Sequence, residues 1–131
     1  MQLCVANIVQ SFLVEKSNII WRMGFTRIGA DMLNIRATLP IAALKGDILQ
    51  LMKEHDVLVV CGETGSGKTT QVPQFILDDM IESGHGGYCN IICTQPRRIA
   101  VVAERVADER CEPSPGSDGS LIGYQVRLDS A

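Results

Sequence analysis

The sequence predicts an α/β fold, in which a partial parallel sheet carries helices on both faces. Short apolar runs of β-branched residues alternate along the chain with longer runs whose apolar residues recur at helical spacing. A glycine-rich stretch directly follows one of the short runs and directly precedes a helical one. With 46% hydrophobic and 21% charged residues, the 131-residue chain can bury one core, so we expect a single domain.

The first clear elements lie in the middle of the chain. Residues 41–54 have apolar residues at helical spacing behind a proline suited to a first turn, which predicts a helix. Residues 57–61 (Val-Leu-Val-Val-Cys) form an unbroken apolar run, typical of a strand buried on both faces of a parallel sheet. After the glycines, residues 69–82 are expected to be a helix, because Pro73 lies close enough to its start to cost little.

The carboxyl-terminal half repeats the alternation. We expect a strand at 90–94, a helix at 98–110, a surface loop at 112–120 and a strand at 121–127. Strands that alternate with helices at this spacing imply right-handed crossovers and therefore parallel pairing. Because the chain ends before such a sheet would normally be complete, the sheet is expected to be partial. Residues 1–35 show no clear period and remain unassigned.

Composition excludes several classes of protein. The formal net charge of −3 argues against a disordered charged chain and against binding to nucleic acid through bulk basicity, so any anion site must be local. No apolar run reaches the roughly 20 residues that span a bilayer, and no membrane partner is expected. The five cysteines include no CxxC pair, which disfavours a zinc site. We expect an intracellular protein whose cysteines are reduced. The cytoplasm is the favoured compartment, and the nucleus or an organelle is the alternative.

The glycine-rich stretch matches the motif G-x-x-x-x-G-K-[ST] between a predicted strand and a predicted helix. Its glycines let successive backbone N–H groups point inward, and the helix start adds its positive dipole end. Lys68 would reach the β- and γ-phosphates, and the Thr69 hydroxyl would bind Mg²⁺. An incidental glycine-rich turn is the weaker alternative. The motif therefore predicts a P-loop NTPase with ATP and Mg²⁺ as cofactors, bound by Gly62, Glu63, Thr64, Gly65, Ser66, Gly67, Lys68 and Thr69.

The flanking segments narrow the class of P-loop protein. Together with the glycine loop, they resemble the opening of the first RecA-like domain of DEAH/DExH-box ATP-dependent RNA helicases, most closely the large multidomain DExH-box branch. The resemblance runs from residue 36 to the end, so residues 36–131 are identified as a truncated helicase ATP-binding domain. The segments that carry it are Arg36-x-x-Leu39-Pro40, residues 62–75, Thr94-Gln95-Pro96-Arg97-Arg98 and Gly123-Tyr124-Gln125-Val126-Arg127.

This resemblance implies an NTP hydrolase in which ATP bridges two RecA-like domains and drives movement along RNA. It gives Arg105 a place on the adenine face and puts Arg127 in a segment that continues toward the RNA path. The alternative for Arg105 is an exposed helical arginine that pairs with Glu109 at i+4. The helical run before Arg105 is about two residues shorter than in the family, which would rotate the helix by about 200° or move its start.

The resemblance also assigns contacts to the backbone of single-stranded RNA. A Pro-Arg-Arg turn at the carboxyl end of a parallel strand would place two cations at the sheet edge where ligands bind. A solvated helix start is the alternative for these arginines. The residues assigned to the RNA backbone are Thr94, Gln95, Arg97 and Arg98.

The sequence also departs from the family. It contains no Asp-Glu-x-His motif, no Ser-Ala-Thr motif and no second RecA-like domain with arginine fingers, and that domain is the expected partner in a longer chain. The acidic pairs at 78–79 and 108–109 are interpreted as charged helix faces. We therefore expect the chain alone to bind without catalysing hydrolysis. The alternatives are a non-enzymatic nucleotide- or RNA-binding fragment, and another P-loop enzyme such as a nucleotide kinase or secretion-type ATPase.

Overall fold

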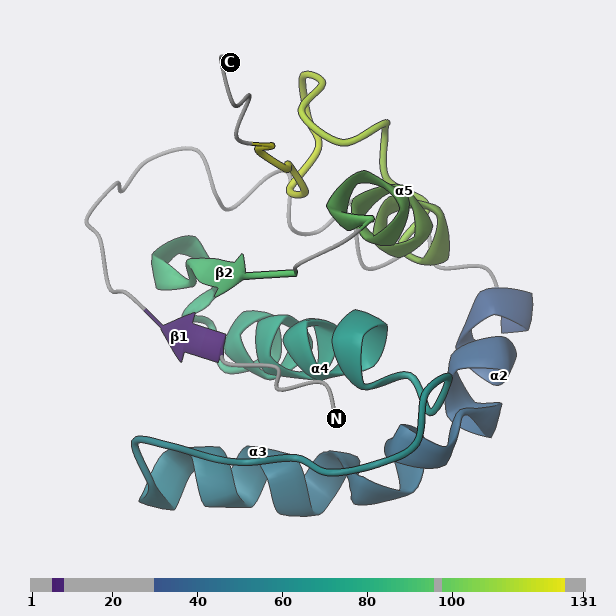
Figure 1. Ribbon diagram of the computed structural model, residues 1–131. Coiled ribbons are helices and arrows are strands. Elements are labelled where there is room, and N and C mark those ends of the chain that lie inside the picture. Colours follow the sequence, from purple (N-terminus) through teal and green to yellow (C-terminus); the bar gives the residue numbers. More distant parts are fainter. Residues whose placement is uncertain (1–5, 9–29, 96–97, 127–131) are drawn as a thin grey trace, which may run out of the picture.

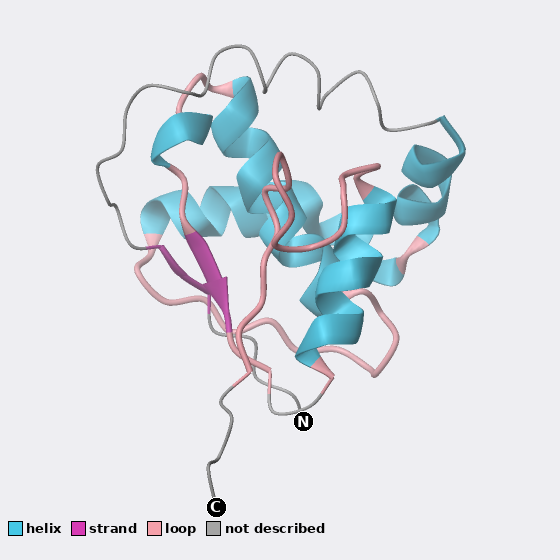
Figure 2. Cartoon of the chain, turned by 90° about the horizontal axis from the view of Figure 1, so that it is seen from above, coloured by secondary structure: helices cyan, strands magenta, loops and turns pink. Residues whose placement is uncertain are grey.

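The computed structural model describes residues 6–8, 30–95 and 98–126, and Figure 1 shows their arrangement. Helix α4 occupies the centre, between α3 and α5, and it also contacts β2 and both 3₁₀ segments. The two strands lie together on one side of the helices (Figure 2). The elements are β1 (Ala6–Ile8), α2 (Ala30–Thr38), η1 (Pro40–Leu44, 3₁₀), α3 (Lys45–Glu54), α4 (Lys68–Glu82), η2 (Gly86–Tyr88, 3₁₀), β2 (Ile91–Cys93) and α5 (Ile99–Glu109).

The three predicted helices are confirmed, with one difference. The helix expected over 41–54 is a 3₁₀ segment, η1, followed by α3. Pro40 begins η1, and the backbone N–H of Ile41 donates to the Ser66 carbonyl oxygen at 3.1 Å. Because the first amides of a helix have no intrahelical acceptor, this hydrogen bond satisfies one of them and ties η1 to the glycine loop. Pro73 lies within α4 without ending it.

The apolar core lies between α4 and the pair formed by η1 and α3. Burying one such side chain stabilises the fold by about 1.5–3 kcal/mol, so this small cluster is the main apolar contribution to stability. Lys45 covers one edge of the core, with its Nζ 5.7 Å from the centroid of the Phe75 ring. The buried members are Ile41, Ile48, Val72, Phe75 and Ile76, and the partly buried residues packed against them are Leu39, Leu49, Met52, Leu58, Val60 and Ile91.

The prediction of a strand buried on both faces at 57–61 is wrong for the described structure. Val57 and Val59 are 78% and 61% exposed, whereas Leu58 and Val60 are partly buried against the core. This alternation is that of an extended segment with one covered face. Residues 57–61 do not form a strand, because no segment in the described part of the chain pairs with them through backbone hydrogen bonds.

The predicted parallel sheet is likewise not found among the described residues. There β2 pairs with β1 in an antiparallel ladder, in which Ile92 lies opposite Asn7. The strand expected at 90–94 is confirmed in its centre. Residues 121–126 are irregular, so the third strand is not confirmed, and residue 127 lies outside the described residues. Pairing with β1, which belongs to the unassigned segment 1–35, could not be foreseen because that segment shows no periodicity.

Candidate nucleotide-binding site

The glycine loop leads directly into α4. Gly65 and Gly67 have φ of 86° and 91°, in the left-handed region that favours glycine, and Gly67 is the N-cap of α4. A Cβ on Gly67 would lie 3.1 Å from side-chain atoms of both Ile41 and Leu39. Gly67 is therefore required both by its backbone conformation and by close packing. Because the loop ends at the start of α4, it lies beside the positive end of that helix dipole.

Lys68 is held inside the glycine loop. Its Nζ donates to the carbonyl oxygens of Gly62 and Glu63, each at 2.7 Å, and to Ser66 Oγ at 3.0 Å. An ammonium group has three N–H donors, so the loop itself provides an acceptor for each. A Cβ on Gly62 would come within 3.4 Å of Nζ and narrow this space. A phosphate that binds Lys68 must therefore replace some of these acceptors.

A cleft of about 150 Å³ lies beside the loop and brings together residues far apart in sequence. Arg105, on α5, contributes to it, and its Nε lies 3.0 Å from Glu109 Oε1 in an i,i+4 ion pair. The two interpretations of Arg105 are thus compatible, since the paired arginine also lines the cleft. Helix α5 begins at Ile99, and this start leaves Arg105 at the loop despite the shorter run. The cleft is lined by Leu39, Thr64, Gly65, Gly67, Lys68, Thr69, Thr70 and Arg105.

A second polar region is buried between α4 and α5. Glu109 Oε2 accepts hydrogen bonds from Gln71 Nε2 at 2.7 Å and from Gln74 Nε2 at 2.8 Å. Gln71 and Gln74 are 0% and 1% exposed. From the sequence, Glu109 is expected only as an ion-pair partner of Arg105, and Gln71 and Gln74 have no predicted role of their own. Positions 71, 74 and 78 follow helical spacing behind Lys68, and this polar stripe is the signal that could have identified them.

The interpretation of the acidic pairs at 78–79 and 108–109 as charged helix faces is wrong for Asp78 and Glu109. Asp78 is buried and pairs with Arg36 Nη2 at 3.2 Å and with Arg110 Nη1 at 2.7 Å. These two arginines come from α2 and from the carboxyl-terminal end of α5. Ionised side chains are buried when oppositely charged partners compensate for the lost hydration. Their neighbours Asp79 and Asp108 are less buried, as a charged helix face requires.

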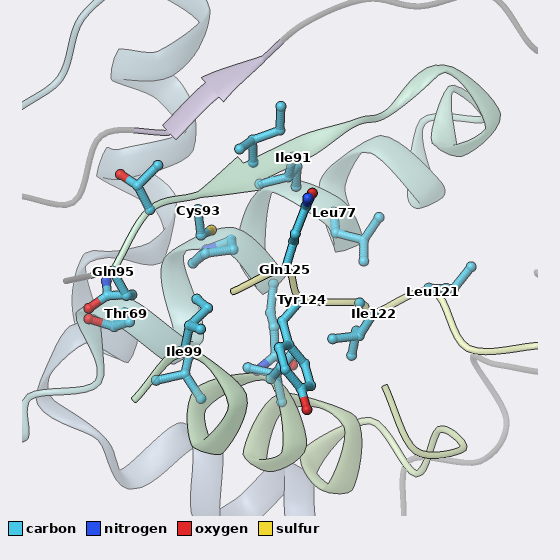
Figure 3. Close-up of a pocket in the computed structure, with 18 of the residues that line it drawn as sticks. Thr69, Leu77, Ile91, Cys93, Gln95, Ile99, Leu121, Ile122, Tyr124 and Gln125 are labelled. Carbon is cyan, nitrogen blue, oxygen red and sulfur yellow. The ribbon is translucent and has the colours of Figure 1, made fainter. Parts of the chain in front are cut away.

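A larger cavity of about 540 Å³ lies between α4, β2, α5 and residues 121–125. Figure 3 shows Thr69 and Gln95 at one end and Leu121 at the other. Thr94 also lines this cavity, and Thr69 lines both cavities. Thr69 therefore connects the region predicted for the nucleotide with the region predicted for RNA.

Of the arginines expected at the RNA path, the structure describes one. Arg98 is exposed and is the N-cap of α5, with a left-handed φ of 58°. Arg97 and Arg127 lie outside the described residues. Within the described part of the chain, no cluster of three or more acidic, histidine or cysteine side chains could hold a metal ion. Nor does any described helix have the length and apolar character needed to cross a membrane.

A glycine loop that closes around a lysine at the first position of a helix is typical of a P-loop protein. No family model matches the chain. Sequence comparison finds 76% identity over 101 residues with the DExH-box ATP-dependent RNA helicase DExH4, chloroplastic, of Arabidopsis thaliana. The ATP-dependent RNA helicase dhx29 of Xenopus laevis is 52% identical over 103 residues, and the human ATP-dependent DNA/RNA helicase DHX36 is 54% identical over 102 residues.

These alignments cover 76–77% of the chain but only 7–10% of the length of the relatives. The homologues of the aligned segment are DExH/DEAH-box ATP-dependent RNA helicases, which confirms the resemblance found in the sequence. This homology implies a P-loop, RecA-like fold for the segment, although the parallel sheet of such a fold is not found among the described residues.

Proposed function

We propose that the chain binds Mg-ATP at the glycine loop and serves as the phosphate-binding part of an ATP-dependent RNA helicase. The observation that carries this proposal is the buried ammonium of Lys68 at the centre of the loop, beside a cleft that Thr69 and Arg105 share. The names of the relatives support ATP as the nucleotide and RNA as the nucleic acid.

The chemistry of the loop fits a triphosphate and its metal ion. Backbone N–H groups at the start of α4 would bind phosphate oxygens, and Lys68 would exchange the carbonyls of Gly62 and Glu63 for them. The Thr69 hydroxyl would hold Mg²⁺, which neutralises charge on the β- and γ-phosphates when bound. The remaining proposed contacts to the nucleotide are Glu63, Thr64, Gly65, Ser66, Gly67 and Arg105.

The proposal extends to the backbone of single-stranded RNA. Thr94 and Arg98 are exposed in the segment that connects β2 to α5, and Gln95 lines the cavity that includes Thr69. Cationic and hydroxyl side chains hold phosphates without reading bases. Arg97 and Arg127 are included on the family resemblance alone.

Turnover is proposed to require more than these residues. The 131-residue sequence has no Asp-Glu-x-His motif to position the attacking water, and the arginine fingers of the family belong to a second RecA-like domain. Groups that act only in the transition state are the ones that lower the barrier. We therefore propose that the polypeptide by itself binds ATP without helicase-like hydrolysis.

Calorimetric titration of the chain with Mg-ATP tests the nucleotide site. Lys68→Ala should abolish binding, because it removes the cation that meets the β- and γ-phosphates. Lys53→Ala is the matched control, since Lys53 is exposed on α3 and pairs with Asp79 away from the loop. Equal affinities for the wild type and Lys68→Ala would overturn the proposal. RNA-stimulated phosphate release that disappears in Lys68→Ala would overturn the absence of turnover.

Salt titration of RNA binding tests the second contact region. The Arg97→Ala/Arg98→Ala double variant should weaken binding to a single strand and lower the slope of log affinity against log salt by roughly 0.7 per lost phosphate contact. Lys53→Ala again serves as the control. Unchanged affinity and slope in the double variant would contradict the assignment.

An intracellular location completes the proposal. Cys61 and Cys111 are exposed free thiols, which persist in reducing compartments. One relative is named as chloroplastic, so the proposed compartments include an organelle as well as the cytoplasm. Imaging of the tagged full-length protein tests this, and its appearance outside cells would contradict it.

A further inference from the structure

The ion pair between Arg105 and Glu109 differs from an ordinary surface pair. Arg105 is 58% exposed at the side chain, whereas Glu109 is only 5% exposed. Exposed i,i+4 pairs are weak because both side chains must be ordered for one contact in water. Here one partner is already ordered by its surroundings. Glu109 can therefore act as a fixed anchor for the arginine that lines the phosphate-loop cleft.

The anchor is fixed from α4, the helix that begins with Lys68. Both glutamine amides of α4 donate to Glu109 Oε2, while Arg105 Nε donates to Oε1. Both oxygens of the carboxylate thus accept hydrogen bonds, which hold the group in one orientation.

The orientation of the Gln71 amide is itself determined. Its Oε1 accepts from Arg36 Nε at 2.9 Å, and because an arginine nitrogen can only donate, the amide oxygen must face Arg36. The amide nitrogen then faces Glu109 and also donates to Thr70 Oγ1 at 3.1 Å. Thr70 and Arg105 both line the cleft. The hydrogen bonds that run from Thr70 through Gln71 and Glu109 to Arg105 therefore connect two residues of the cleft lining.

We propose that Glu109 is a positioning residue that fixes the guanidinium of Arg105 at the phosphate-loop cleft, so that its planar face packs against the base of the bound nucleotide. Glu109 does not line the cleft and acts through Arg105. Planar guanidinium groups stack on aromatic rings, and ordering the group in advance reduces the entropy lost on binding. This inference rests on the proposed nucleotide site. It adds the residue that determines how Arg105 contacts the base.

The test compares Mg-ATP with Mg-tripolyphosphate, which has the phosphates but no base. Glu109→Gln should weaken ATP binding about two- to fivefold, the fold-change expected for loss of an exposed cation–π contact, and leave tripolyphosphate binding unchanged. Arg105→Ala should give the same pattern. In the Arg105→Ala background, Glu109→Gln should have no further effect on ATP. Glu104→Gln, at an exposed position of the same helix, is the matched control and should change neither affinity.

Each contrary result is distinguishable. Equal weakening of ATP and tripolyphosphate by Glu109→Gln would show that Glu109 supports the phosphate loop rather than Arg105. A further loss of ATP affinity in the Arg105→Ala background would show that Glu109 does not act through Arg105. If the wild type fails to bind tripolyphosphate, the nucleotide site itself is wrong. Should Glu109→Gln fail to fold by circular dichroism, Glu109→Asp keeps the charge and must show the same selective loss.

Discussion

The two buried faces of α4 differ in chemistry although both exclude water. One face packs Val72, Phe75 and Ile76 against η1 and α3. The other presents Gln71, Gln74 and Asp78 to buried partners, which include Arg36 on α2 and Glu109 on α5. Periodicity in the sequence identifies the first face, but it predicts no buried polar face and interprets Asp78 as part of a charged helix face. Burial therefore follows the available partners as well as hydrophobicity.

The two faces of α4 differ in how substitutions change the free energy of unfolding. Apolar burial stabilises in proportion to area, so trimming one methyl group has a small effect. A buried ion pair contributes little net stability when complete, because desolvation offsets attraction, but removing one partner leaves an uncompensated charge. We therefore expect the polar face to be the more sensitive to single substitutions.

The largest effect is expected for Asp78→Ala, which leaves Arg36 and Arg110 buried without their shared carboxylate. Urea denaturation should show a loss of about 3–5 kcal/mol in unfolding free energy. Asp79→Ala, one residue along the same helix, removes only a pair with the exposed Lys53 and should cost about 0–1 kcal/mol. Equal losses for the two variants would mean that the buried ion pairs of Asp78 contribute no more to stability than the exposed pair of Asp79.

An intermediate effect is expected for Gly67→Ala, because Gly67 lies where the two faces meet the loop. The new Cβ would contact Ile41 on the apolar side and Gln71 on the polar side, at a φ of 91°. A non-glycine residue in this conformation should lower the unfolding free energy by about 1–3 kcal/mol. Gly46→Ala is the matched control, since it has open space within α3 and should instead stabilise by about 0.4–1 kcal/mol. The same sign for both substitutions would contradict this account.

The smallest effect is expected on the apolar face. Ile76→Val removes one buried methyl group and should cost about 0.5–1.5 kcal/mol in thermal or urea unfolding. Ile35→Val makes the same change at a 51% exposed position of α2 and should stay within about 0.5 kcal/mol of the wild type. If Ile76→Val cost more than Asp78→Ala, the ranking of the two faces would be reversed.

Elements that depend on neighbouring residues in the sequence are predicted correctly, whereas elements that need a partner far along the chain are not. Helices α4 and α5 begin within a residue of their predicted starts, because apolar spacing, glycine and proline act locally. The segment 57–61 has the composition of a strand, but a strand also needs neighbours, and β1 pairs with β2 instead. The assignments of Gly62 to Thr69 to ATP and of Arg98 to RNA remain predictions, since geometry alone does not identify a ligand.

The sequence by itself determined the glycine loop, the lysine at the start of α4 and the apolar face behind it, because these depend on residues a few positions apart. Only the tertiary structure decided that Arg105 lines the cleft beside the loop and that Gln71 and Gln74 on α4, the first oriented by Arg36 on α2, hold the Glu109 carboxylate of α5. Those contacts join α2, α4 and α5, which are separated along the chain. Local periodicity cannot reveal them, since a polar residue with a buried partner and one in water look the same in sequence.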